Sequence, residues 1–287
     1  MPTDSVQLAL AVFEICLLLA GAWLFLRLLL VPQQRSRWLA TNALPHWPVT
    51  LAEFGLFLAL IFLAIFVGQS VARMMLGSYI AKAADRAGLE VFVYGASLHG
   101  GALIGWRLFP ALRRSMYADY GAQPPIAPSV PALPWSRVVL YAGGTLLVTM
   151  PVLIILSLGW TQLLHQLGLP DEPQDLIAVF SNTRSPAVIA GMFVVACVLA
   201  PLNEELLFRS GLYRYCRQTL GRGWALAISG ICFGALHLNW AAFLPLAALG
   251  AIFALVYEAT GDIRVPIIAH ALFNLNAVLA VLSGLQL

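Results

Sequence analysis

The stretch that decides the fold class is LAEFGLFLALIFLAIFVGQSVARMML at residues 51–76. Its only charged residues are Glu53 near the start and Arg73 near the end. A helix needs about 20 mostly apolar residues to cross the roughly 30 Å hydrocarbon core of a bilayer, and this stretch is long enough. It lacks the alternation of apolar and polar residues found in the strands of membrane barrels. It therefore predicts a transmembrane α-helix.

Similar apolar stretches lie along the whole chain of 287 residues. By the same length criterion we predict about eight spans: 7–31, 51–76, 89–109, 137–160, 186–204, 223–238, 242–259 and 265–284. Only 10% of the residues are charged and 61% are hydrophobic, whereas about a quarter of the residues of a soluble domain are charged. We expect an all-α fold, a polytopic transmembrane helical bundle.

The segments between the predicted spans are too short to fold as separate domains. We therefore expect one continuous membrane domain, with N-terminal helices of unassigned role in residues 1–160 and the residues that carry chemistry in 161–287. The net charge of +3 is small and spread over the loops. Because a nucleic-acid-binding protein gathers its positive charge on one face, we expect the lipid bilayer as a partner and no nucleic acid.

The charges between the spans predict the orientation, because Arg and Lys are retained on the cytoplasmic side of a membrane. Basic residues follow the first, third and fifth predicted spans, which are alternate loops: Arg27, Arg35, Arg37, Arg107, Arg113, Arg114, Arg137, Arg209, Arg214, Arg217 and Arg222. The loop after the fourth span is acidic, with Asp171, Glu172 and Asp175. Three residues after the second span oppose this pattern: Arg73, Lys82 and Arg86. We expect a multi-pass protein of the cell inner membrane with both termini outside the cytoplasm.

Ionisable residues within spans are energetically costly and usually functional. The fifth span ends in NEELLFR at residues 203–209, an EExxxR pattern. On a helix Glu205 and Arg209 are i, i+4 neighbours and should pair, whereas Glu204 points about 100° away and remains an unpaired carboxylate. A solvated helix end at the membrane surface would explain these charges equally well.

Two later spans carry histidines at helical spacing. Phe233 precedes His237 by one turn in the sixth span, and His270 precedes Asn274 by one turn in the last span. Such groups also form hydrogen bonds between transmembrane helices, so neither pair alone predicts a site. Two further polar residues near these motifs, Asn239 and Asp262, are either supporting residues or ordinary loop residues.

A shared site would place Glu204 inside the bilayer. We therefore expect the fifth helix to continue past Arg209 to about Arg217, and the sixth span to begin deeper in the membrane than its apolar boundary suggests.

The three motifs in this order resemble those of the CAAX-protease and bacteriocin-processing (CPBP) membrane proteins, an intramembrane protease family also called Abi or type II CAAX prenyl endopeptidases. The segment YEATGDIRVPIIAHALFN at residues 257–274 is similar to the run of Tyr-Glu, a Gly turn and Pro that precedes the family's HxxxN helix. The resemblance covers about residues 186–280.

The resemblance implies specific roles for the motif residues. Glu204 would activate a water molecule with the help of His237, while His270 and Asn274 would polarise the scissile carbonyl and stabilise the oxyanion. A carboxamide beside an imidazole can donate the hydrogen bonds that an oxyanion needs. The supporting residues would be Glu205, Arg209 and Phe233.

We therefore expect an intramembrane endopeptidase that cleaves near the C-terminus of a membrane-associated or lipid-modified protein, with no preferred cofactor. One alternative is a zinc metalloprotease in which Glu204, His237 and His270 hold the ion, although Asn is a poor zinc ligand and the sequence contains no HExxH. Another is a non-catalytic membrane protein, either an immunity or scaffolding factor or a transporter that relays protons. A transporter would be expected to show paired helix breaks, which we do not find.

Overall fold

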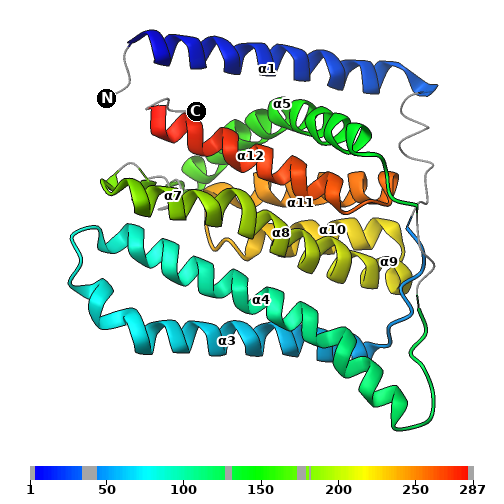
Figure 1. Ribbon diagram of the computed structural model, residues 1–287. Helices are drawn as coiled ribbons and strands as arrows, with labels where there is room; N and C mark the ends of the chain where they lie inside the picture. The colour runs from blue at the N-terminus through cyan, green and yellow to red at the C-terminus, as the bar shows by residue number, and fades with distance from the viewer. Residues whose placement is uncertain (1–3, 34–43, 127–130, 173–178, 181, 284–287) are drawn as a thin grey trace. The chain divides into compact units, whose positions relative to one another are not determined.

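The structure is a computed structural model in which residues 4–33, 44–126, 131–172, 179–180 and 182–283 are described (Figure 1). These residues are largely helical and include no strand. Among them, 7 helices are long and apolar enough to cross a membrane. The predicted all-α, polytopic bundle is confirmed, and the chain is a multi-pass membrane protein. Three charges used to predict its orientation lie outside the described residues: Arg35, Arg37 and Asp175.

The predicted and observed numbers of spanning helices differ because of the predicted sixth span. Residues 223–238 were expected to cross the membrane, but the helix there is α10 (Arg222–Ala235), with 14 residues. At 1.5 Å per residue it is about 21 Å long, which is less than the roughly 30 Å of a hydrocarbon core. The apolar run is divided by the turn at residues 236–239, where the chain reverses into α11 (Trp240–Thr260). The described chain therefore has one helix of spanning length fewer than predicted. Because α10 and α11 form an antiparallel hairpin, with Ala225 of α10 near Ala254 of α11, the start of α10 and the end of α11 lie on the same side, and both termini of the chain can still share one side of the membrane.

The contacts of the chain divide it into two compact units. Unit 1 comprises Met1–Pro45, Ser129–Ser181 and Glu204–Leu287, and unit 2 comprises His46–Pro128 and Asn182–Asn203. The predicted boundary at residue 160 concerned the roles of the helices and stays a prediction.

Unit 2 is built on a helical hairpin, α3 (Leu51–Ala81) and α4 (Arg86–Ala118), whose helices lie side by side (Figure 1). Gly101 and Gly105 of α4 face α3 so closely that an added Cβ would lie 2.7 Å from the Ala64 carbonyl oxygen and 2.6 Å from the Ile61 Cα. Small residues spaced four apart let two backbones approach in this way. The same unit contains α7 (Pro186–Val194), which packs on α4.

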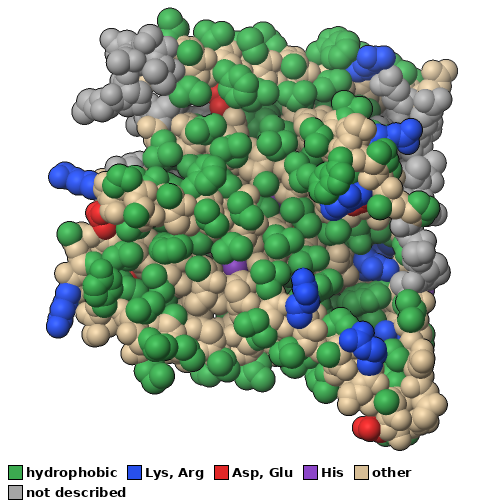
Figure 2. Space-filling model, viewed as in Figure 1, with side chains coloured by type: hydrophobic (Ala, Val, Ile, Leu, Met, Phe, Trp, Pro, Cys, Tyr) green, Lys and Arg blue, Asp and Glu red, His purple; other side chains and the backbone are tan. Residues whose placement is uncertain are grey.

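Unit 1 is organised around α5 (Trp135–Leu167), which contacts α1 (Asp4–Leu30), α11 and α12 (Arg264–Ser283). Its buried core contains Phe208, Phe233 and Phe253 with aliphatic residues of α5, α11 and α12. Away from the core, the face shown in Figure 2 is covered mainly by hydrophobic side chains. Apolar residues exposed in this amount suit a surface that faces lipid.

The helix from Pro186 to Leu220 carries the first motif. It consists of α7, a π-helical turn at Val195–Leu199, α8 (Ala200–Glu205), a second π-helical segment at Leu206–Tyr213 and α9 (Arg214–Leu220). Pro201 has no N–H for an ordinary helical bond, and the first wide turn directly precedes it. The prediction that this helix continues past residue 209 is confirmed. The depth at which α10 begins stays a prediction.

Candidate active site

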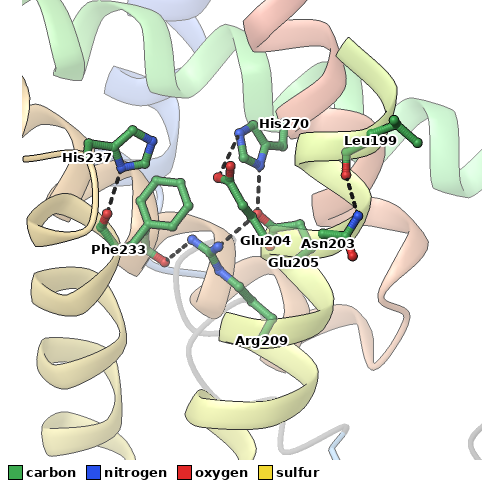
Figure 3. A network of polar contacts seen from close by, with 9 residues as sticks. Leu199, Asn203, Glu204, Glu205, Arg209, Phe233, His237 and His270 are labelled. Carbon is green, nitrogen blue, oxygen red and sulfur yellow. Dashed lines mark hydrogen bonds and ion pairs between the residues drawn. The ribbon is translucent and has the colours of Figure 1, made fainter. Parts of the chain in front are cut away.

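The predicted site residues all lie in unit 1, on three parts of the chain that are distant in sequence. The end of α8 and the π-helical segment after it carry Glu204, Glu205 and Arg209; α10 and the turn after it carry Phe233 and His237; α12 carries His270 and Asn274. Figure 3 labels all of these residues except Asn274.

Glu205 is the central residue of the site and is fully buried, with an exposed fraction of 0%. Its Oε1 lies 2.8 Å from Nη1 of Arg209 and 2.9 Å from Nδ1 of His270 (Figure 3). The predicted Glu205–Arg209 pair is confirmed. The contact with His270, which lies 65 residues later in the chain, was not predicted. One carboxylate oxygen therefore joins the first motif to the last one.

Arg209 is also fully buried, at 0% exposed. Its Nη2 donates a hydrogen bond of 2.9 Å to the carbonyl oxygen of Gly250. Its guanidinium lies 4.6 Å from the Phe233 ring centroid and 5.4 Å from that of Phe253, distances at which aromatic rings attract a cation. We counted Arg209 among the loop charges that set the orientation, and this was wrong. It is a buried charge that the Glu205 carboxylate neutralises.

Glu204 points away from this pair and toward His270 (Figure 3). Its Oε2 lies 3.8 Å from Nε2 of His270, a distance that allows electrostatic attraction but is too long for a hydrogen bond. Within the described residues this buried oxygen has no hydrogen-bond partner, while the side chain as a whole is 24% exposed. As predicted, Glu204 is left out of the ion pair between Glu205 and Arg209.

The contacts of His270 indicate which ring nitrogen carries a proton. A carboxylate can only accept a hydrogen bond, so we assign the proton facing Glu205 to Nδ1. The other nitrogen, Nε2, then faces Glu204. The ring is 3% exposed and packs against Phe233 and Phe253, with centroids 5.8 Å and 5.3 Å away. Asn274 follows one turn later on α12 and is half-buried.

His237 lies on the other side of Phe233 from His270 (Figure 3). Its ring centroid is 5.1 Å from that of Phe233, and its Nδ1 lies 2.8 Å from the Phe233 carbonyl oxygen. A carbonyl only accepts, so Nδ1 carries the proton and Nε2 is free to accept a hydrogen bond from another group. The structure therefore brings Glu204, Glu205 and His270 close together. His237 is linked to them only indirectly, because its ring packs on Phe233 and Phe233 packs on His270.

The zinc alternative needs ligands that converge on one ion. Within the part of the chain that is described, no group of three or more His, Cys, Asp or Glu side chains is arranged so that it could hold a metal ion. The proposed ligands His237 and His270 have an aromatic ring between them (Figure 3). We therefore derive no chemical step through a metal.

The sequence analysis did not single out Glu14, and it noted Glu258 only as part of the Tyr-Glu run, yet both carboxylates are buried. Glu14 of α1 is 7% exposed, and its Oε2 has no hydrogen-bond partner among the described residues. Glu258 of α11 is 0% exposed and accepts hydrogen bonds from Tyr213 and, at 2.9 Å, from Arg217. Both lie in apolar stretches, so the argument that drew attention to the EExxxR pattern applies to them as well.

Asp262, one of the two residues left open between a supporting and a loop role, precedes α12. It accepts hydrogen bonds from the Leu133 and Arg264 backbone N–H groups, at 3.0 and 3.1 Å, and from the Arg264 side chain. The Arg264 guanidinium, followed by the two backbone donors, holds the pKa of this carboxyl below its usual range. Asp262 therefore ties the start of α12 to the segment before α5, and has no contact with the site residues among those described.

Comparisons with known proteins match the part of the chain that carries these residues. Residues 186–276 match the family model of type II CAAX prenyl endopeptidase Rce1-like proteins. The predicted resemblance to the CAAX-protease family is confirmed. The chain is also 32% identical over 95 residues to a Bacillus subtilis (strain 168) protein named "Putative membrane peptidase YdiL". That alignment covers 33% of this chain and 39% of the relative. No solved structure matches the chain. The matched family and the matched relative are both described as peptidases, and the family match contains all three motifs.

Proposed function

We propose that this chain is an intramembrane endopeptidase of the cell inner membrane, with both termini outside the cytoplasm, that cleaves near the C-terminus of a membrane-associated or lipid-modified protein. Its partners would be the lipid bilayer and that protein or peptide substrate, with no nucleic acid. The observation that carries the proposal is the position of Glu204, whose Oε2 faces His270 Nε2 at 3.8 Å without a hydrogen-bond partner of its own among the described residues.

In the first step Glu204 acts as general base. It takes a proton from water while the water oxygen forms a bond to the scissile carbonyl carbon. His237 can assist, because its Nδ1 proton is donated to the Phe233 carbonyl and its Nε2 can accept the second hydrogen bond of the water. Glu204 and His237 would thus hold the water beside the scissile carbonyl, which lowers the entropic part of the barrier.

In the second step the developing oxyanion is stabilised. Glu205 accepts the Nδ1 proton of His270 at 2.9 Å. To donate to the oxyanion from Nε2, His270 must enter the step already carrying both ring protons, and it keeps both of them throughout. The carboxamide of Asn274, one turn away, is the second donor. When the intermediate collapses, the carbon–nitrogen bond breaks and the leaving amine takes the proton that Glu204 had accepted.

Glu205 and Arg209 support these steps without reacting. The Arg209 guanidinium pairs with the Glu205 carboxylate, and the same carboxylate orients His270. No cofactor is part of this proposal. Zinc remains the alternative, and chelation separates the two as described below.

The proposal is tested by comparing the C-terminal peptides of membrane proteins from cells that contain either the wild-type chain or Glu204→Gln at equal level. We expect processed C-termini of a defined set of membrane proteins to disappear in the variant, because the amide cannot take a proton from water. Identical C-terminal peptides in both cell lines would refute the proposal.

A further inference from the structure

The turn between α10 and α11 has an unusual backbone. Leu238 has a φ of +50°, and among the described residues it is the only non-glycine with a positive φ. A side chain with a Cβ is disfavoured in this region of backbone space. No packing of the leucine offsets this cost, because the side chain is 92% exposed. Something else in the structure must therefore hold the turn.

The residues after Leu238 supply that restraint. The Oδ1 of Asn239 accepts a hydrogen bond of 2.8 Å from the Ala242 N–H and so caps α11. Its Nδ2 donates a bond of 3.1 Å to the carbonyl oxygen of Glu172. The carbonyl oxygen of Trp240 accepts a bond of 2.6 Å from Trp160 Nε1 of α5. The turn is thus fixed both to its own helix and to the C-terminal end of α5 with the segment that follows.

The same turn determines the geometry of His237. The backbone N–H of His237 bonds to the Gly234 carbonyl at 3.3 Å, one residue short of the α-helical partner. This tight last turn leaves the Phe233 carbonyl oxygen available, and the His237 ring donates to it from Nδ1 at 2.8 Å. The orientation of the His237 ring and the choice of Nδ1 as its protonated nitrogen therefore both depend on how α10 ends at Leu238.

We propose that the His237–Trp240 turn is a positioning device for His237, in which Asn239 is the positioning residue and Leu238 carries the backbone strain. The exposed leucine side chain itself has no part in it. From the sequence alone Asn239 is either a supporting residue or an ordinary loop residue, and this proposal makes it a supporting residue. The inference rests on the proposed function for its effect on catalysis, whereas the geometry of His237 can be measured without it.

The test compares two substitutions at one position in the purified full-length protein. Leu238→Gly removes the strain and frees the turn, because glycine adopts many more conformations. Leu238→Ala keeps a Cβ, and with it the strained turn, but removes the exposed apolar side chain. Asn239→Asp serves as an independent variant: it keeps the acceptor that caps α11 and loses the donor to the Glu172 carbonyl.

Three quantities are measured: the melting temperature, the rate at which diethyl pyrocarbonate modifies His237 relative to the exposed His165, and the cleavage of an internally quenched lipidated peptide. For Leu238→Gly and Asn239→Asp we expect a several-fold change in His237 modification and a kcat lowered by roughly ten- to a hundredfold at unchanged KM. The melting temperature of Leu238→Gly should not fall. Leu238→Ala should match the wild type in all three.

An unchanged rate of His237 modification in Leu238→Gly would overturn the proposal. An equal loss of kcat in Leu238→Ala and Leu238→Gly would also overturn it, because that result would assign the role to the leucine side chain. If the wild type cleaves no peptide, the proposed function fails, and the rate of His237 modification alone decides on the positioning role.

Discussion

At the scale of single residues, the bridging position of Glu205 is what distinguishes it from Glu204. Replacing Glu205 by Gln would leave the guanidinium of Arg209 buried without a countercharge, which costs about 3–5 kcal/mol. We expect Glu205→Gln to lower the melting temperature and the activity, because the neutral amide oxygen also accepts the His270 Nδ1 proton more weakly than the carboxylate does. Glu204→Gln should lose activity at an almost unchanged melting temperature.

A matched control separates the two roles of Glu205. The double variant Glu205→Gln with Arg209→Met removes both buried charges, so its melting temperature should recover toward the wild type while its activity stays low. Recovery of both properties would show that Glu205 only balances the charge of Arg209 and does not position His270.

Individual side chains also determine whether cleavage depends on a metal ion. In the proposed mechanism His237 and His270 are held by a carbonyl and a carboxylate, at 2.8 and 2.9 Å, and Asn274 has a role. We expect the purified protein to contain less than one zinc per chain and to remain active after prolonged chelation and desalting, as elemental analysis and a cleavage assay will show. Stoichiometric zinc, with activity lost on chelation and restored by added Zn²⁺, would decide for the metalloprotease.

At the scale of helices, the hairpin of α10 and α11 places the second motif. A Cβ added to Gly234 would lie 2.5 Å from the Phe243 carbonyl oxygen, while one added to Gly223 of the same helix would meet nothing within 4 Å. We expect Gly234→Ala to destabilise the protein by about 1–3 kcal/mol. Gly223→Ala should be neutral or stabilising by up to about 1 kcal/mol. Equal melting temperatures for the two variants would contradict this packing.

The helices also show how far the sequence could lead. Length and apolar content were enough to place the spans, and i, i+4 spacing was enough to pair Glu205 with Arg209. Neither could find the contact of Glu205 with His270, because it depends on how separate helices pack. The short α10 was predicted as a full span for a related reason. Its apolar residues, such as Phe233, pack inside the protein, and hydropathy does not distinguish a buried residue from one that faces lipid.

At the scale of the whole molecule, the orientation in the membrane is the main untested feature. The loop after α4 should be cytoplasmic and the loop after α5 should lie outside. We expect Pro170→Cys to react in intact cells with an outer-membrane-permeant maleimide that does not cross the inner membrane, and Tyr120→Cys to react only after that membrane is permeabilised. The reverse pattern would place both termini in the cytoplasm.

The measurement that tests the central claim most directly is the rate at which purified protein cleaves a defined lipidated peptide, compared between the wild type and Glu204→Gln at equal melting temperature. Loss of the general base should lower kcat by at least about 10²-fold, with mass spectrometry showing hydrolysis at a single peptide bond in the wild type only. Equal rates for the two proteins, at the same bond, would contradict the assignment of Glu204 and with it the mechanism.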